Sequence, residues 1–339
     1  MPEPTLFPFS EYWWLYAGFT LFVGLLLFLD LGVFHRKEHE VTFREASTWT
    51  VVWVVLAMAF NVGLYLYLRH RLPLDPRLTA SEGFDALAAA RTAALEFMAG
   101  YVVEYSLSVD NIFVFVVVLS YFAIPGALQH RVLFFGILGA LVFRAAFIAA
   151  GALLLRYGWV TWVFGVFLIV TGLRIMFAHG EAAKPEDNAV VRLFRRMVPV
   201  TPRLEGRRFF VSVDGRRHAT PLFVCLLVLE MTDIVFAVDS VPAIFALTDE
   251  PFIVFSSNIF AILGLRSLYF LLKGAVDKFH LLKYGLGVVL VFVGLKMVWL
   301  NRAWGGHFPI VPSLAIIVGV IATSIILSLL FPKPPEGAR

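Results

Sequence analysis

Glu104-Tyr-Ser-Leu-Ser-Val-Asp110-Asn111 sets two carboxylates inside an otherwise apolar run of this chain. A second apolar run contains three more, in Glu230-Met-Thr-Asp233-Ile-Val-Phe-Ala-Val-Asp239-Ser-Val-Pro242. A carboxylate at membrane depth costs several kcal/mol unless it meets a cation, a polar partner or water. Acidic groups in two matched clusters therefore predict a pathway for cations.

The composition around these clusters is that of an integral membrane protein. Of the 339 residues, 60% are hydrophobic and 15% are charged, whereas soluble domains average about 25% charged residues. The one cysteine, Cys225, excludes an internal disulfide framework and a cysteine-based metal cluster. The net charge of +4 is typical of basic cytoplasmic loops. We therefore expect the lipid bilayer as a partner, and no nucleic acid.

Several segments have the length and hydropathy to cross a bilayer, which takes roughly 20 apolar residues. The chain is predicted to be an all-α polytopic membrane protein with about nine transmembrane helices. These helices are expected at Tyr12–Phe34, Thr48–Leu68, Arg91–Ser120, Val132–Leu155, Trp159–Ala178, Pro221–Leu247, Pro251–Leu272, Leu281–Leu300 and Pro312–Leu330. The third and the sixth carry the acids near their midpoints, so the carboxylates are expected at depth.

The distribution of Lys and Arg predicts the orientation, because cytoplasmic loops carry the excess of basic residues. If the loop 179–220 is cytoplasmic, most other basic loops and the C-terminal tail share its side, while the residues before the first span hold no Lys or Arg. We expect the N-terminus outside, the C-terminus inside, and a multi-pass chain in the cytoplasmic (inner) membrane. Within the loop, Asp214-Gly215 follows an alternating run and predicts a small hairpin.

Polar positions recur along the chain and predict an internal repeat. Gly172-Leu-Arg174 recurs as Gly294-Leu-Lys296, at an offset of 122 residues. Each repeat holds three spans, an odd number, so the second copy enters from the opposite face, as in many secondary transporters. Two inverted three-helix repeats divide the chain into two accessory spans (1–90), the first repeat (91–178), the basic cytoplasmic loop (179–220), the second repeat (221–300), and a final span with the tail (301–339).

The acids six residues apart in each cluster do not share one face of a straight helix, because six residues rotate by about 600°. Two explanations stay open. The helix is broken between the acids, for instance near Ser108 or Pro242, or the two acids face different neighbours. Glu230 and Asp233, three residues apart, share a face.

The candidate ligands are all oxygen donors, which suit Mg²⁺, Ca²⁺ and Mn²⁺ better than Zn²⁺ or Cu²⁺. The metal-binding set is Glu104, Asp110, Asn111, Glu230, Asp233 and Asp239, with Ser108, Thr232 and Ser240 as possible additional ligands. Arg144 and Arg266 are possible charge partners, in a cation site or in a purely structural ion bridge. Crowded like charges favour proton uptake by at least one acid in the empty site, which predicts exchange of the cation for protons.

Longer strings of this chain resemble the TerC family of integral membrane proteins. They are Glu104–Asn111, Ala219-Thr-Pro-Leu-Phe223, Thr232–Thr248 and Asp249–Phe270. The resemblance implies manganese export across the cytoplasmic membrane of bacteria. It also carries the family's motif acids onto Glu104, Asp110, Glu230, Asp233 and Asp239.

The sequence therefore predicts a secondary transporter that exports Mn²⁺ as its substrate, with no permanent cofactor and no catalytic residue. A Walker-type loop is absent from the sequence, which disfavours ATP hydrolysis. Two alternatives stay open: export of another divalent cation such as Ca²⁺, and a membrane factor that supports assembly or metallation of exported proteins. A third alternative, an intramembrane hydrolase that uses the carboxylate pairs, is disfavoured because no paired His or nucleophilic Ser stands beside them. A homo-oligomer and a partner in the secretion machinery stay open as well.

Overall fold

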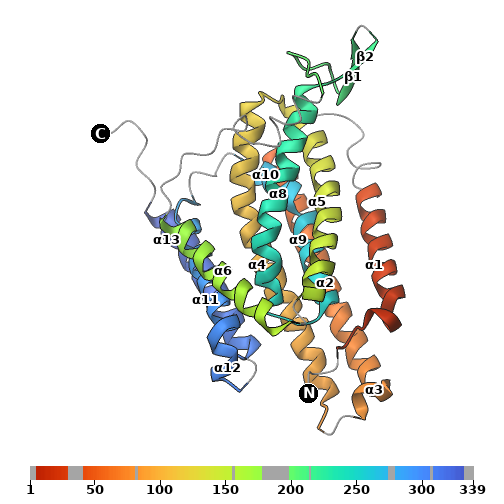
Figure 1. The fold of residues 1–339 in the computed structure, drawn as a ribbon, viewed down its shortest axis with the longest axis vertical. Coiled ribbons are helices and arrows are strands. Elements are labelled where there is room, and N and C mark those ends of the chain that lie inside the picture. Colours follow the sequence, from red (N-terminus) through yellow and green to blue (C-terminus); the bar gives the residue numbers. More distant parts are fainter. Residues whose placement is uncertain are drawn as a thin grey trace.

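The computed structural model describes residues 5–29, 41–80, 83–154, 157–177, 198–213, 215–273, 279–305 and 308–331. Within these ranges, eight helices are long and apolar enough to cross a membrane. The helices α9 (Pro251–Leu263) and α10 (Leu265–Leu272), bent by 40°, make a ninth if the pair is one span. The prediction of an all-α polytopic membrane protein is confirmed (Figure 1).

The helices follow the apolar runs closely. The long ones are α1 (Phe9–Leu29), α2 (Phe43–Arg71), α4 (Ala86–Tyr121), α5 (Gly126–Leu154), α6 (Gly158–Phe177), α8 (Pro221–Phe245), α11 (Leu282–Leu295) and α13 (Ile310–Leu330). Short turns are η2 (Leu72–Leu74), α3 (Pro76–Thr79), the π-helical η5 (Lys296–Leu300) and α12 (Asn301–Ala303). Several helices begin earlier than predicted. For example, α4 begins at Ala86 because the Asp85 carboxylate caps it, accepting from the Leu87 and Ala88 N–H groups.

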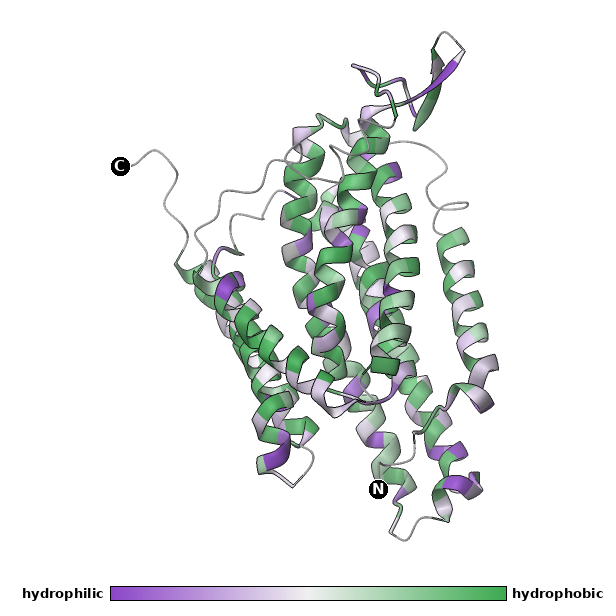
Figure 2. Cartoon of the chain, viewed as in Figure 1, coloured by the Kyte–Doolittle hydropathy of each residue, from purple (hydrophilic) through white to green (hydrophobic). Residues whose placement is uncertain are grey.

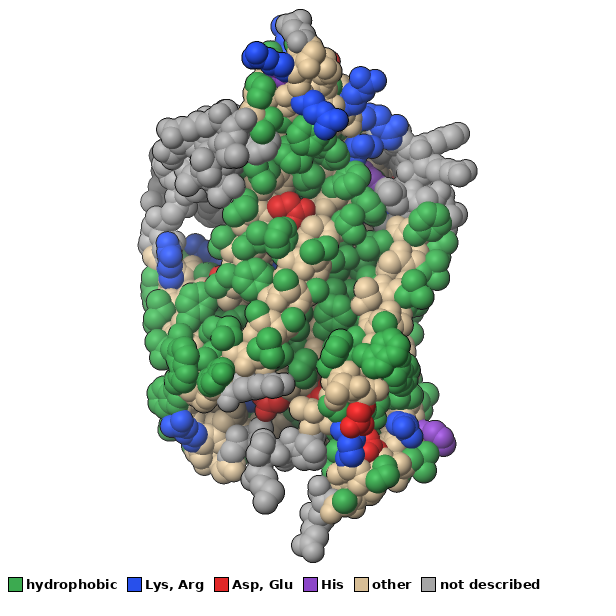
Figure 3. Space-filling view, turned by 45° about the vertical axis from the view of Figure 1, so that its right-hand side comes forward, with side chains coloured by type: hydrophobic (Ala, Val, Ile, Leu, Met, Phe, Trp, Pro, Cys, Tyr) green, Lys and Arg blue, Asp and Glu red, His purple; other side chains and the backbone are tan. Residues whose placement is uncertain are grey.

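The helix α4 is the centre of the bundle. Within its most apolar stretch of 18 residues, 62% of the residues are buried, against 22% in the corresponding stretches of α1, α2, α6 and α13. It packs against α2, α8, α9 and α13, while α5 packs against α8 and α9. Hydrophobic residues predominate along the helices (Figure 2), and the face in Figure 3 carries a hydrophobic band with Lys and Arg gathered mainly at the hairpin end. Such a surface suits contact with lipid.

The helices α6 and α11 lie side by side and lean away from α4, α5 and α8 (Figure 1). Glycines allow their backbones to meet. A Cβ atom at Gly172 would lie 2.5 Å from the Gly287 carbonyl oxygen, and one at Gly165 would lie 3.1 Å from the Gly294 carbonyl oxygen. Small residues permit this close packing of membrane helices.

A two-stranded antiparallel hairpin stands at one end of the bundle, as the sequence predicts. Its strands are β1 (Phe210–Val213) and β2 (Arg216–Ala219), joined through Gly215 with φ +75°. The ring of Phe210 packs 4.4 Å from that of Phe223 on α8, and this contact holds the hairpin to the end of the bundle.

The N-terminal segment is tied to the turn between α8 and α9. The Glu250 carboxylate accepts hydrogen bonds from the Leu6 N–H at 2.6 Å and the Phe7 N–H at 3.3 Å. Phe7 is 1% exposed and packs against Phe252. Burial raises the pKa of the Glu250 carboxyl from 4.5 to about 7, although the two N–H groups oppose this shift.

Replacing Glu250 with glutamine is expected to flatten the pH dependence of stability. Because the folded state keeps the Glu250 proton up to about pH 7, this group stabilises the fold fully below about pH 4 and loses that contribution as the pH rises to about 7. We expect a loss of about 3 kcal/mol over this window in the wild type, and none from this position in Glu250→Gln. Melting temperatures in detergent across the window measure the difference, and parallel curves for the two proteins would contradict it.

Candidate functional site

Arg144 is the centre of a buried polar cluster in the middle of the bundle. Its side chain is 0% exposed on α5, within apolar surroundings. The guanidinium forms a bidentate contact with Asp233 on α8, with Nη2 2.9 Å from Oδ1 and Nε 3.1 Å from Oδ2. Its Nη1 donates to the Glu104 carboxylate on α4. Such charge-assisted forks are among the strongest contacts between side chains.

One residue from a fourth helix and a second residue of α8 complete the cluster. Asn258 on α9 donates from Nδ2 to Glu104 Oε2 at 3.0 Å, and its Oδ1 lies 3.5 Å from Arg144 Nη1. Ser240 Oγ accepts from the same nitrogen at 3.3 Å. Two carboxylates and one guanidinium leave a formal charge of −1 if both acids are ionised. The arrangement therefore offers oxygen ligands from α4, α8 and α9 around one cationic side chain of α5.

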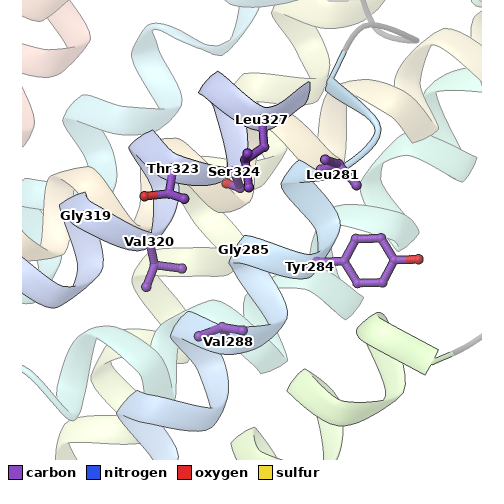
Figure 4. A pocket seen from close by; sticks show the side chains of 9 residues that line it. All are labelled: Leu281, Tyr284, Gly285, Val288, Gly319, Val320, Thr323, Ser324 and Leu327. Carbon is purple, nitrogen blue, oxygen red and sulfur yellow. The ribbon is translucent and has the colours of Figure 1, made fainter. Parts of the chain in front are cut away.

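Little space remains beside this cluster. A cavity of about 10 Å³ adjoins Asp233, lined otherwise by apolar residues such as Leu229 and Leu265, and that is barely enough for one water molecule. A larger groove of about 410 Å³ lies between α11 and α13 (Figure 4); its lining residues include Tyr284, Val320 and Thr323, and no acid. In the described part of the chain, no group of three His, Cys, Asp or Glu residues is placed to hold a metal ion.

The two acid-bearing helices are continuous, and for the acids of α8 the second explanation of their spacing holds. The helix α8 runs unbroken through Pro242, and its acids face different neighbours. Asp233 faces Arg144 on α5, whereas the half-buried Asp239 lies 3.5 Å from Thr171 Oγ1 on α6, which donates to it. No broken helix is needed to direct the acids apart.

Glu230 and Asp233 both face α5, as their spacing predicts, but they meet different groups there. Glu230 is half-buried against Gly139, at a place that a Cβ atom of residue 139 would fill. Its Oε2 is buried with no hydrogen-bond partner among the described residues. The missing side chain at Gly139 thus leaves the space that the Glu230 carboxylate occupies. Among the described residues, no cationic side chain is hydrogen-bonded to this carboxylate.

The other predicted ligands are placed as follows. Asn111 is 2% exposed and Ser108 is 0% exposed, with Ser108 Oγ unpartnered among described atoms. Thr232 Oγ1 donates to its own helix, at Val228 O. Arg266 is buried on α10, and the side chain of Asp110 lies outside the described part.

Sequence reasoning missed Asn258, Gly139 and Thr171. Asn258 carries the signal that singled out the acids, a polar side chain inside an apolar run, and that signal could have found it. Gly139 and Thr171 have no such signal. They contact the acids because α5 and α6 pack beside α8, which a sequence pattern does not specify.

Residues 89–335 match the family model described as "Integral membrane protein TerC family". The chain is 49% identical over 317 residues to "Uncharacterized membrane protein STKORF319" of Myxococcus xanthus, covering 93% of this chain and 92% of that protein. It is 41% identical over 316 residues to "Putative membrane-bound redox modulator Alx" of Escherichia coli (strain K12), covering 93% and 94%. No solved structure matches the chain.

Proposed function

Because the chain belongs to the TerC family of integral membrane proteins, we propose that it is a secondary transporter that exports Mn²⁺ across the cytoplasmic membrane in exchange for protons. The N-terminus lies outside and the C-terminus in the cytoplasm in this proposal. The acids of the two clusters provide the cation's ligands during its passage.

One observation carries the proposal. Glu104, from the first predicted repeat, and Asp233, from the second, come from distant parts of the sequence and converge on the buried guanidinium of Arg144. Buried charge inside a membrane bundle typically marks the route of an ion or substrate. Carboxylate, amide and hydroxyl oxygens are the ligands that suit Mn²⁺, and the cluster contains all three.

The packing of the helices supports two inverted repeats. The first helix of the first repeat, α4, packs against the second helix of the other repeat, α9, and α8 packs against α5 in the reciprocal way. At the offset of 122 residues, Gly165 corresponds to Gly287 and Gly172 to Gly294. The observed close pairs are Gly165 with Gly294 and Gly172 with Gly287. Reciprocal pairs of this kind are what a two-fold axis between the halves requires.

The redox description printed for the Escherichia coli relative suggests a second kind of function. Thiol–disulfide exchange within one chain needs two cysteines. This sequence has one, Cys225, which is buried in α8. The cysteine content therefore favours transport over dithiol chemistry carried out by this chain alone.

Flux of Mn²⁺ into proteoliposomes tests the proposed function. We expect wild-type protein to move Mn²⁺ in response to a pH gradient, and Asp239→Asn to lower the rate by about tenfold or more, a loss of about 1.4 kcal/mol in transition-state stabilisation. The control is Glu205→Gln, which neutralises an exposed acid outside the bundle. Parallel assays with Ca²⁺ and Mg²⁺ determine the selectivity. Unchanged flux after collapse of the pH gradient would contradict proton exchange.

Substitution of Gly139 tests whether Glu230 belongs to the pathway. In Gly139→Ala the new methyl group takes the place of the Glu230 carboxylate, which must move while the backbone stays. We expect Mn²⁺ flux to fall about threefold to tenfold with little loss of folded protein. Gly136→Ala, one turn earlier on α5, is the matched control, because the nearest atom to its Cβ would be Leu226 Cδ1 at 3.9 Å. Equal flux in the two variants would remove Glu230 from the route.

A further inference from the structure

The Arg144 guanidinium takes up the oxygen atoms that a divalent cation would need. Its nitrogens contact the carboxylates of Glu104 and Asp233, Ser240 Oγ and Asn258 Oδ1. These are four oxygen-bearing side chains of the kind that bind hard cations. The cavity of about 10 Å³ beside them is lined, apart from Asp233, by apolar residues, so it offers a cation no second set of ligands while the guanidinium holds these oxygen atoms.

An exporter must also return its empty site across the membrane. Two ionised carboxylates without a cation are costly in an apolar interior, and leaving a buried charge unpaired is strongly destabilising. A tethered guanidinium removes that cost, because it supplies one positive charge and a fork that matches both acids. It cannot leave the protein, so it competes with a cargo ion for the same atoms.

We propose that Arg144 is a built-in substitute for the divalent cargo, which holds the carboxylates of Glu104 and Asp233 together when no cation is bound and withdraws when one enters. The inference rests on the proposed function. Arg144 is in this view a positioning residue that keeps cation affinity moderate, so that release on the far side is possible. A purely structural ion bridge makes the opposite prediction, since its removal creates no cation site.

Equilibrium binding of Mn²⁺ to purified protein, followed by the electron paramagnetic resonance signal of free Mn²⁺, tests this inference without a transport assay. Arg144→Gln, purified in Mn²⁺ and then dialysed, is expected to bind Mn²⁺ about tenfold or more tightly than wild type. Its flux in proteoliposomes is expected to fall, because the cation becomes resident. The matched control combines Arg144→Gln with Glu104→Gln and Asp233→Asn, which keeps polar side chains at these positions but removes their charges. We expect this triple variant to bind Mn²⁺ no more tightly than the wild type.

A second variant protects the test against misfolding of the first. Asn258→Asp adds a carboxylate beside Arg144 Nη1 without removing the arginine, and the extra charge favours a divalent ion over the guanidinium. We expect tighter Mn²⁺ binding there too. The inference is overturned if neither variant binds Mn²⁺ more tightly than wild type, whether or not Arg144→Gln can be recovered. If neither variant binds more tightly but the wild-type protein transports Mn²⁺, the inference fails and the proposed function stands. If the variants bind Mn²⁺ more tightly but the wild-type protein transports none, the proposed transport function fails and the role of Arg144 as a substitute for the cation stands.

Discussion

Replacing Arg144 with leucine is expected to lower the unfolding free energy by about 3–5 kcal/mol when divalent cations are chelated. The side chains of Glu104 and Asp233 are 0% and 4% exposed, so neither carboxylate reaches water when the guanidinium is gone. Leucine fills part of the volume but provides no donor. The two acids would then face each other and Ser240 without a cation. The carboxylates must then take up protons, or the bundle must unfold locally so that they reach water.

Unfolding of the purified variant by SDS in mixed micelles measures this loss. Arg302→Leu is a control for the same substitution, because Arg302 is exposed on α12 and lies 4.7 Å over the Trp162 ring. We expect that variant to lose less than about 1 kcal/mol. Adding Glu104→Gln and Asp233→Asn to Arg144→Leu is expected to recover most of the stability, since a buried ion pair replaced as a whole is often neutral. If Arg144→Leu alone is as stable as the wild type, then Glu104 and Asp233 are uncharged when the guanidinium is absent.

The course of the helices could be predicted from hydropathy, because a chain in lipid satisfies its backbone groups only within helices. The hairpin at β1 and β2 could also be predicted, since the alternation and the glycine act locally. Hydropathy does not reveal α9 and α10 as a bent pair. The break at Gly264 does not interrupt the apolar run, so the sequence shows a single span there.

The candidate site was predictable in its residue types and only partly in its geometry. The acids are recognisable because charge inside an apolar run is costly. Which acid meets which neighbour depends on the packing of α5, α6 and α9 against α4 and α8, and helix periodicity alone left Asp233 and Asp239 with two explanations. The pairing of Arg144 with two acids at once requires side chains separated by 40 and 89 residues along the chain, and no local pattern encodes it.

A large side chain placed in the close contact between α6 and α11 is expected to destabilise the protein strongly. Gly172→Leu is expected to lower the unfolding free energy by about 3 kcal/mol, at the upper end for overpacking. A Cβ atom there would lie 2.5 Å from the Gly287 carbonyl oxygen and 3.0 Å from the Val291 nitrogen. Both are backbone atoms, which cannot turn aside as a side chain can, so the helices must separate. Gly24→Leu on α1 is the control, since nothing lies within 4 Å of its Cβ position.

The same contact tests the two-fold relation between the repeats. Gly294 corresponds to Gly172 in the other repeat, and a Cβ atom there would lie 2.6 Å from the Gly165 carbonyl oxygen and 3.0 Å from the Ile169 nitrogen. Because the two environments match, Gly294→Leu is expected to cost as much as Gly172→Leu, within about 0.5 kcal/mol. The double variant is expected to cost less than the sum, since one separation of α6 from α11 relieves both overlaps. A harmless Gly294→Leu beside a damaging Gly172→Leu would show that the two helices are not equivalent, and the case for inverted repeats would then rest on the sequence alone.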